Sequence, residues 1–149
     1  MSAQHTTNIP CVAIVLRRDD KVLFLLREHT GWRDGYYCLP SGHVEDDESF
    51  TDAAQRELLE ETGIKVDPGQ LDHALILHHQ SDDGVRVTSC FEVEGWTGEP
   101  QNAEPHKHAE IAWLDPAKLP ENIVESSRFM LQQIAAGQHY AEMGWQATT

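Results

Sequence analysis

The sequence has no uninterrupted apolar run of the length that a membrane-spanning helix needs, roughly 18 residues or more. Residues 1–9 are polar and lack the apolar core of a secretory signal. These two absences lead us to expect a cytoplasmic protein with no membrane partner.

Cysteine is also scarce. Cys11, Cys38 and Cys90 are an odd number of thiols at scattered positions, and none forms a Cys-x2-Cys pair. The pattern therefore indicates neither a disulfide framework nor a zinc cluster. Cys11 and Cys90 lie in apolar or alternating runs, so we expect buried, reduced thiols.

Basic residues are few: 11 Lys and Arg stand against 25 Asp and Glu, which gives a formal net charge of −14. Such a charge argues against non-specific binding to nucleic acid polymers or acidic membranes. It still allows a small phosphorylated ligand that arrives with its own metal ion. The 149 residues suit one domain with a real core, and no repeat, low-complexity stretch or linker divides them.

Runs rich in β-branched and alternating apolar residues predict strands at 9–16, 22–26, 36–39, 71–79, 85–93 and 109–114. Asp83-Gly84 predicts a hairpin turn between the fourth and fifth of these. A second amphipathic helix is expected over 126–136, ended by Gly137, with Phe129, Met130, Ile134 and Ala135 facing inward. Strands, a helix, more strands and a helix predict a mixed sheet between helices. Residues 1–8 and 141–149 are expected to be short flexible ends, although Trp145 could dock on the surface.

The most informative segment runs from Gly42 to Ile64. Its centre, Arg56-Glu57-Leu58-Leu59-Glu60-Glu61, places three carboxylates at i, i+3 and i+4, on one face of a helix. Three like charges on one face cost free energy unless a cation lies among them. Oxygen ligands of this kind suit Mg²⁺ or Mn²⁺.

The helix itself follows from local signals. Ser49 is a good N-cap, and Asp52 three residues later completes a variant of the capping box. Gly63 is the expected left-handed C-cap. The inward stripe is expected to comprise Phe50, Ala53, Ala54, Leu58 and Leu59. The acidic triplet falls in the last turns, where the helix dipole disfavours negative charge, and this conflict indicates function rather than stability.

These residues resemble the Nudix box, Gly-x5-Glu-x7-Arg-Glu-U-x-Glu-Glu-x-Gly-U, in which U is a bulky apolar residue. Every specified position is filled, by Gly42, Glu48, Arg56, Glu57, Leu58, Glu60, Glu61, Gly63 and Ile64. Just before the box, Ser41 replaces one glycine of the family's usual Pro-Gly-Gly. The resemblance implies an α/β protein, a single Nudix hydrolase domain over 1–149 with its box at 42–64. It also implies an α/β/α sandwich with a mixed sheet between helices.

Nudix hydrolases break the pyrophosphate bond of a nucleoside diphosphate that is linked to another group. The resemblance implies that the glutamates of the box hold Mg²⁺, or Mn²⁺ in its place, with the backbone carbonyl of Gly42 as a further ligand. The residues implied in catalysis are Glu48, Arg56, Glu57, Glu60 and Glu61. Among them, Arg56 and Glu48 would form a pair that holds the ligating carboxylates in position. Whether a box glutamate or a loop glutamate activates the water is left open by the sequence.

Three residues outside the box match positions in MutT-like members. Arg27 ends the second strand, 15 residues before Gly42, and is either a phosphate contact or a surface arginine. Glu104 lies in a loop that resembles the one carrying an additional metal-binding or basic glutamate. Asn122 could read the edge of a nucleobase, because an amide donates and accepts at once, or could simply precede a helix.

Purely structural explanations, or a different metal site, compete with these functional interpretations. An acidic run alone is usually a solvated helix face, but the spaced glycines and Glu48 argue against that here. A Ca²⁺ loop of the EF-hand type lacks its ligand pattern. His78 and His79 are adjacent in a strand and point to opposite faces, so they cannot chelate together. His106 and His108 either touch substrate or, as is more usual, face solvent. The aromatic residues Trp32, Tyr36 and Tyr37 line a base pocket or pack in the core.

The substrate is inferred by elimination. The Pro or Tyr that marks the ADP-ribose and dinucleoside-polyphosphate branches is absent from 79–82, which read His-Gln-Ser-Asp. A MutT-like (deoxy)nucleoside triphosphate pyrophosphohydrolase is therefore favoured, with an ADP-ribose or nucleotide-sugar pyrophosphatase as the alternative. A non-catalytic nucleotide-binding Nudix module is the alternative from another class, and the intact glutamates argue against it. The expected partner is a small nucleotide rather than a nucleic acid polymer, and a homodimer is compatible with the sequence.

Overall fold

The computed structural model describes residues 4–146 of the chain, and its strands form one mixed sheet. The strands are β1 (Ile9–Arg18), β2 (Lys21–Arg27), β3 (Tyr37–Cys38), β4 (Ser41–His43), β5 (Leu71–Ser81), β6 (Gly84–Val93), β7 (His108–Leu114) and β8 (Tyr140–Met143). The main path runs β3-β2-β1-β6-β5-β8, while β4 pairs with β1 and β7 with β2. The pairs β1–β6 and β5–β8 are parallel and the other pairs are antiparallel.

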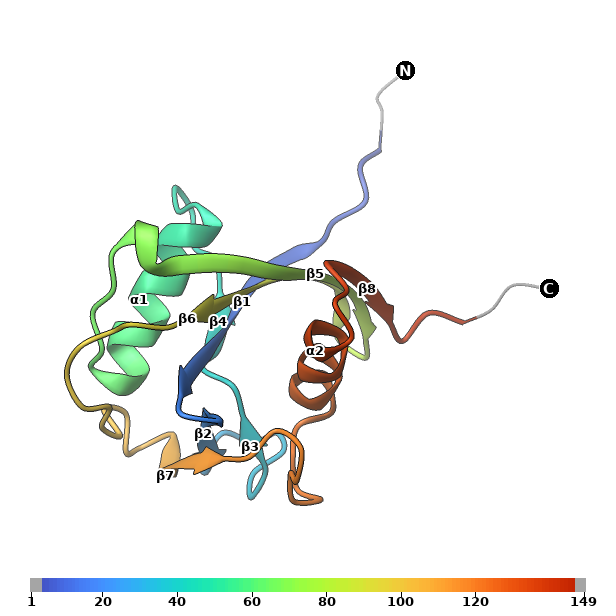
Figure 1. Ribbon diagram of the computed structural model, residues 1–149. Helices are drawn as coiled ribbons and strands as arrows, with labels where there is room; N and C mark the ends of the chain where they lie inside the picture. Colours follow the sequence, from blue (N-terminus) through green and yellow to red (C-terminus); the bar gives the residue numbers. More distant parts are fainter. Residues whose placement is uncertain (1–3, 147–149) are drawn as a thin grey trace.

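Two helices, α1 (Phe50–Thr62) and α2 (Glu125–Ala135), lie on opposite sides of these strands, and a short 3-10 turn, η1 (Pro68–Gln70), precedes β5 (Figure 1). The alternation of β1 explains both layers, since successive side chains of a strand point to opposite faces. Ala13 and Val15 join the core under α2, which contributes Met130 and Leu131. The other face of β1 packs under α1, in a core that contains Val12, Ile14, Leu16, Ala53, Ala54 and Leu58. The expected α/β/α sandwich is therefore confirmed.

The predicted hairpin is confirmed, with Ser81 opposite Gly84 across a two-residue turn. Two inward positions were predicted wrongly. Leu59 is 47% exposed, because it lies on the outer side of α1, and Ala135 is exposed at the end of α2. The structure buries Leu131 instead. Cys11 and Cys90 are free and buried, as expected, and Cys38 is also free and buried.

The C-terminal segment differs from the flexible end that was expected for 141–149. Residues 140–143 form β8, which pairs in parallel with β5, and Ala141 is buried in the core under α2. Trp145 does dock: its indole N–H donates to the carbonyl of His78 at 3.0 Å. Gly144 permits this contact, since a Cβ there would overlap the carbonyl of Gln80.

Of the predicted flexible ends, residues 1–3 and 147–149 lie outside the described part of the chain, and residues 4–8 carry no regular structure and are exposed. Another difference is β4, which pairs with β1 where the sequence predicted only a turn leading into the box. Between residues 4 and 146, no helix combines the length and the apolar character needed to cross a membrane.

Candidate active site

Helix α1 is held by its two caps and one apolar face. The Ser49 side chain accepts from the backbone N–H of Asp52 at 3.0 Å, and Asp52 accepts from the Ser49 N–H at 3.2 Å, so the predicted capping box is present. Gly63 adopts φ 76° and donates its N–H to Leu59 at 2.9 Å. Leu58 is fully buried beneath the helix, and the acidic residues Glu57 and Glu61 lie against β4.

Glu61 is the most deeply buried of these acids, with 7% of the residue exposed. Its carboxylate accepts one backbone hydrogen bond, from the N–H of Ser41 at 3.0 Å. Burial raises its pKa well above the ordinary 4.5, the charges of Glu57 and Glu104 add to the rise, and the bond from Ser41 opposes it. Glu61 is thus a buried acid whose ionised form lacks sufficient positive partners.

Glu57 lies against Gly42 in β4. Its side chain is 13% exposed, and burial raises its pKa, with the charges of Glu60 and Glu104 adding to the rise and Arg56 opposing it. A Cβ built on Gly42 would overlap the Glu57 carboxylate. The glycine therefore leaves the space in which this carboxylate lies.

A Gly42→Ala substitution tests that close approach. The added methyl group must displace the Glu57 carboxylate, so we expect kcat to fall about tenfold or more, in the range seen when the support of a metal ligand is lost. Tm should change little, because φ of Gly42 does not require glycine. The matched control is Gly69→Ala, where a Cβ meets nothing within 4 Å. A Gly42→Ala protein with the kcat of the Gly69→Ala protein would contradict the expectation.

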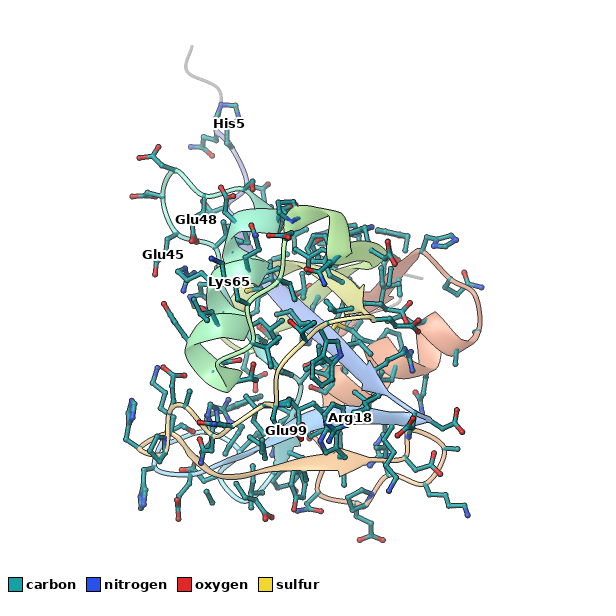
Figure 2. All side chains as sticks on the ribbon, turned by 60° about the vertical axis from the view of Figure 1, so that its left-hand side comes forward. His5, Arg18, Glu45, Glu48, Lys65 and Glu99 are labelled. Carbon is teal, nitrogen blue, oxygen red and sulfur yellow. The ribbon has the colours of Figure 1, made fainter. Side chains whose placement is uncertain are left out.

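Arg56 connects the acidic residues to one another. Its Nε and Nη2 donate to the two oxygens of Glu48 at 2.6 and 2.9 Å, and Nη1 donates to Glu57 at 2.8 Å and to Glu60 at 3.4 Å. A further bond from Nη2 reaches the carbonyl of His43 at 3.0 Å. The bonds from Arg56 lower the pKa of Glu48, and the carboxylates of Glu48 and Glu57 raise the pKa of Arg56. Figure 2 shows Glu48 beside the N-terminal part of α1, so Arg56 spans from the loop before the helix to its acidic face.

The loop before β7 brings Glu104 to the same place. Ala103 donates its N–H to the backbone carbonyl of Glu61 at 3.2 Å, and Gln101 donates to Thr62 at 2.9 Å, so the loop is fastened to the end of α1. The Glu104 side chain is 18% exposed and lies 3.7 Å from the ammonium of Lys107. Lys107 therefore supplies part of the positive charge near Glu61, a role that sequence reasoning missed.

The oxygen ligands at this place are of the kind that a hard divalent cation prefers. Burial raises the pKa values of Glu57 and Glu61, so their ionised carboxylates need a positive partner. Glu57, Glu60, Glu61, Glu104 and the carbonyl of Gly42 are the oxygens that would hold it. They do not form a closed cage: within residues 4–146, no three Asp, Glu, His or Cys side chains converge on one point. Arg56 draws Glu57 and Glu60 to itself, and this bond would compete with a metal.

Arg27 lies at the end of β2, as predicted, but its donors are engaged locally. Its Nε donates to the carbonyl of Trp32 at 2.8 Å and its Nη2 donates to the Thr30 hydroxyl at 3.0 Å. The side chain therefore holds the loop between β2 and β3. This loop is linked to the Glu104 loop, because Glu28 donates its N–H to the carbonyl of Lys107 at 2.8 Å.

Asn122 is also hydrogen-bonded to the loop between β2 and β3. Its Nδ2 donates to the carbonyl of Gly35 at 2.9 Å, and its backbone carbonyl accepts from Tyr37 at 2.8 Å. It does not cap α2, whose N-cap is Val124 without a side-chain bond. Tyr36 and Tyr37 pack against the core, and Trp32 is exposed, so the three aromatic residues have different environments.

His108 is buried, with 4% exposed, which corrects the expectation that it faces solvent. Burial lowers its pKa to about 4, and the charges of Arg27, Lys107 and His106 add to the effect. Its carbonyl accepts from Asn102 at 2.7 Å. Among the described residues, His108 Nδ1 and Asn102 Oδ1 are two of three buried side-chain polar atoms without a hydrogen-bond partner. Nothing in the sequence indicates that these two atoms are buried without a partner.

An open pocket of about 810 Å³ lies elsewhere, at the β1–β2 turn and the loop after β6. Arg18 lines this pocket, and its Nη1 donates to both carboxylate oxygens of Glu99 at 2.8 and 2.9 Å. Figure 2 shows Arg18 and Glu99 away from Glu48. No box glutamate lines this pocket. We place the candidate site at the carboxylates rather than here, because the buried, unbalanced charge is there.

A mixed sheet between two helices, with an Arg-linked acidic face on the first helix, defines a Nudix domain. The chain belongs to this family: the model of the NUDIX domain matches residues 7–134. This confirms the resemblance seen in the box.

Similar proteins carry several different names. The MutT NUDIX hydrolase from Burkholderia pseudomallei superposes with a TM-score of 0.77 at 24% identity, over 85% of this chain and 98% of that one. A bifunctional NMN adenylyltransferase/ADP ribose pyrophosphatase from Francisella tularensis, complexed with AMP and a manganese ion, superposes with a TM-score of 0.66 at 21% identity, over 90% of this chain and 42% of that one. These two likenesses show the fold alone.

A curated relative is similar over a shorter stretch. The NAD-capped RNA hydrolase NudC of Escherichia coli O1:K1 / APEC is 44% identical over 57 residues. The match covers 38% of this chain and 21% of that protein, so it concerns a segment and not the whole relative.

Proposed function

We propose that this Nudix domain is a metal-dependent hydrolase of a pyrophosphate bond in a nucleotide, with Mg²⁺ as the metal and Mn²⁺ as a substitute. The observation that carries the proposal is the carboxylate of Glu61, which is buried and has the charges of Glu57 and Glu104 near it. Burial and these charges raise its pKa, while the Ser41 N–H and Lys107 oppose the rise. A divalent ion would balance this charge. The proposed ligands are Glu57, Glu60, Glu61, Glu104 and the Gly42 carbonyl.

The residues around the carboxylates have different parts in this proposal. When bound, the metal would polarise the phosphoryl oxygens and offset the charge that develops on them. Arg56 donates to Glu48, Glu57 and Glu60 and so keeps these acids oriented. In this role Arg56 itself does not touch substrate. Lys107 is paired with Glu104 and Arg27 is bonded within its own loop, so each must exchange a partner to contact the incoming phosphates. The buried or partly buried carboxylates Glu57, Glu61 and Glu104 are the candidates to take the proton from the attacking water.

For the substrate class we propose a MutT-like (deoxy)nucleoside triphosphate pyrophosphohydrolase. The support is the set of MutT-like positions outside the box: Arg27 and Asn122 both hold the loop beside the carboxylates, and Glu104 lies near Glu61. ADP-ribose or nucleotide-sugar hydrolysis is the second candidate, since one solved relative of the same fold is named as an ADP ribose pyrophosphatase.

The test is a substrate panel with Mg²⁺, in which both products are identified. The panel contains dATP, dGTP, dCTP, dTTP, an oxidised purine triphosphate, ADP-ribose and a nucleotide sugar. Release of pyrophosphate and a nucleoside monophosphate from triphosphates supports the MutT-like proposal. Release of AMP and ribose 5-phosphate from ADP-ribose supports the second candidate. Nucleotide binding without turnover of any compound would instead indicate the non-catalytic module.

Asn122→Ala should change the ranking among nucleobases in this panel. The Asn122 amide holds the loop that carries Trp32, and its acceptor can read a base edge. We expect kcat/KM for the best nucleotide to fall about tenfold, the effect of one lost hydrogen bond in a discriminating site, and the poorest to change little. Gln132→Ala, on the exposed side of α2, serves as the control. A uniform drop over all nucleotides, or no change, would remove Asn122 from base recognition.

A further inference from the structure

The loop between β2 and β3 presents a tryptophan to solvent. Trp32 is 54% exposed, although the loop around it is closely hydrogen-bonded. The N–H groups of Thr30 and Gly31 donate to the Asp34 carboxylate at 3.1 and 3.0 Å. The Thr30 hydroxyl and Arg27 Nε both donate to the carbonyl of Trp32, at 2.9 and 2.8 Å. These hydrogen bonds order the backbone on both sides of Trp32, so the exposed indole is carried by a structured loop.

Two guanidinium groups surround the indole. The Cζ atom of Arg27 lies 5.0 Å from the Trp32 ring centroid and that of Arg33 lies 5.8 Å away. Arg33 also lies 5.5 Å from the Tyr36 ring and pairs with Glu125 of α2 at 2.9 Å. In a chain with a net charge of −14, an exposed aromatic ring with two cations is an unusual local surface. It matches a ligand that combines a planar aromatic ring with negative charge.

This surface adjoins the candidate active site. Arg27 is opposite His108 in the β2–β7 pairing, and the next residue, Glu28, is bonded to the carbonyl of Lys107. Cys38 lies between the two regions. Burial raises its pKa to about 11, the charge of Glu61 adds to the rise, and Arg27 opposes it. The loop that carries Trp32 and the loop that carries Glu104 are therefore neighbours.

We propose that Trp32, framed by Arg27 and Arg33, is the stacking platform for the nucleobase of the substrate. This inference rests on the proposed nucleotide hydrolysis at Glu57 and Glu61. Both guanidiniums lie over the Trp32 ring, and the part of the indole that stays exposed is open to a base. The larger ring system of a purine stacks over more of this surface, so purine nucleotides bind more tightly than pyrimidine nucleotides. The two guanidiniums attract the negatively charged ligand and polarise the stack.

The test measures binding without turnover. Isothermal titration calorimetry with Mg²⁺ gives Kd for α,β-methylene ATP, α,β-methylene CTP and the base-free methylenediphosphonate, none of which can be cleaved at the bridging carbon. The proteins are the wild type, Trp32→Leu, Trp32→Phe and the control Trp145→Leu. Trp145 is a second exposed tryptophan, 43% exposed, in the segment after β8. Circular dichroism and Tm establish that each variant is folded.

We expect Trp32→Leu to raise Kd for α,β-methylene ATP about tenfold, the usual effect of losing one aromatic–base stack. Its effect on the CTP analogue should be smaller, and Kd for methylenediphosphonate should not change. Trp32→Phe should stay within about threefold of wild type because it keeps a ring, and Trp145→Leu should match wild type. Unchanged binding of the ATP analogue by Trp32→Leu would overturn the platform, as would an equal loss for methylenediphosphonate. A wild-type protein that binds the analogues by this pattern yet hydrolyses no nucleotide would retain the platform and refute the proposed function.

Discussion

Exhaustive chelation of divalent cations is expected to abolish hydrolysis, and added Mg²⁺ is expected to restore it. The reason lies in how the basic groups of the site are used. Arg56 is bonded to Glu48 and Glu57, Arg27 holds its own loop, and Lys107 lies beside Glu104. Without a metal, a pyrophosphate would meet the like charges of Glu57, Glu61 and Glu104. We expect activity to fall at least about a thousandfold, since a catalytic metal supplies several kcal/mol of charge stabilisation.

The measurement is pyrophosphate release by protein dialysed against EDTA, before and after addition of Mg²⁺ or Mn²⁺. EDTA already saturated with Mg²⁺ is the control for effects of the chelator itself. Tm provides a second readout, because a metal that binds the folded state raises it in proportion to ln(1 + [metal]/Kd). Retention of a tenth or more of the activity after chelation would contradict a metal-dependent site.

The fold was predictable where local chemistry and long-range packing agree. Ser49, Asp52 and Gly63 mark the ends of α1 in the sequence, and the structure forms both caps from them. The Asp82-Asp83 turn before Gly84 likewise closes the hairpin. The strand β8 could not be predicted in this way. The four residues 140–143 are too few to show a strand pattern in the sequence. They form a strand because they pair with β5 and because Ala141 is buried.

The candidate site shows the same division. Spacing alone places Glu57, Glu60 and Glu61 on one helix face, and the structure adds that only Glu60 is largely exposed, with 48% of its side chain accessible. The sequence could not indicate that Ser41 bonds to Glu61 or that Lys107 approaches Glu104, since both contacts depend on how loops fold against α1. Arg27 and Asn122 were singled out by position, yet their bonds to Trp32 and Gly35 are properties of the folded loop.

Glu61→Gln should lower kcat by about a hundredfold or more and should stabilise the metal-free protein. The amide keeps the size of the side chain and its acceptor for the Ser41 N–H, but it removes the negative charge that a metal would need. Loss of a group that merely supports a ligand costs about 10- to 100-fold, so loss of the proposed ligand should reach at least the upper end. Glu121→Gln, the same change at an exposed position, is the control and should leave kcat unchanged.

The stability effect has a definite sign and pH window. Burial, with the charges of Glu57 and Glu104, raises the folded-state pKa of Glu61 above the ordinary 4.5. Between pH 4.5 and the raised folded-state pKa, the folded protein holds a proton that the unfolded chain has released. The free energy of unfolding therefore falls as pH rises through this window, and the loss persists above the folded-state pKa. Glu61→Gln removes this loss. In EDTA its Tm should exceed that of wild type at pH 7–8, and the difference should vanish as pH falls below about 4.5. Added Mg²⁺ should raise the Tm of the wild type more than that of Glu61→Gln, because the wild type binds the ion with one more carboxylate. A variant with wild-type kcat, or with the wild-type Mg²⁺-induced rise in Tm, would show that Glu61 does not hold the metal.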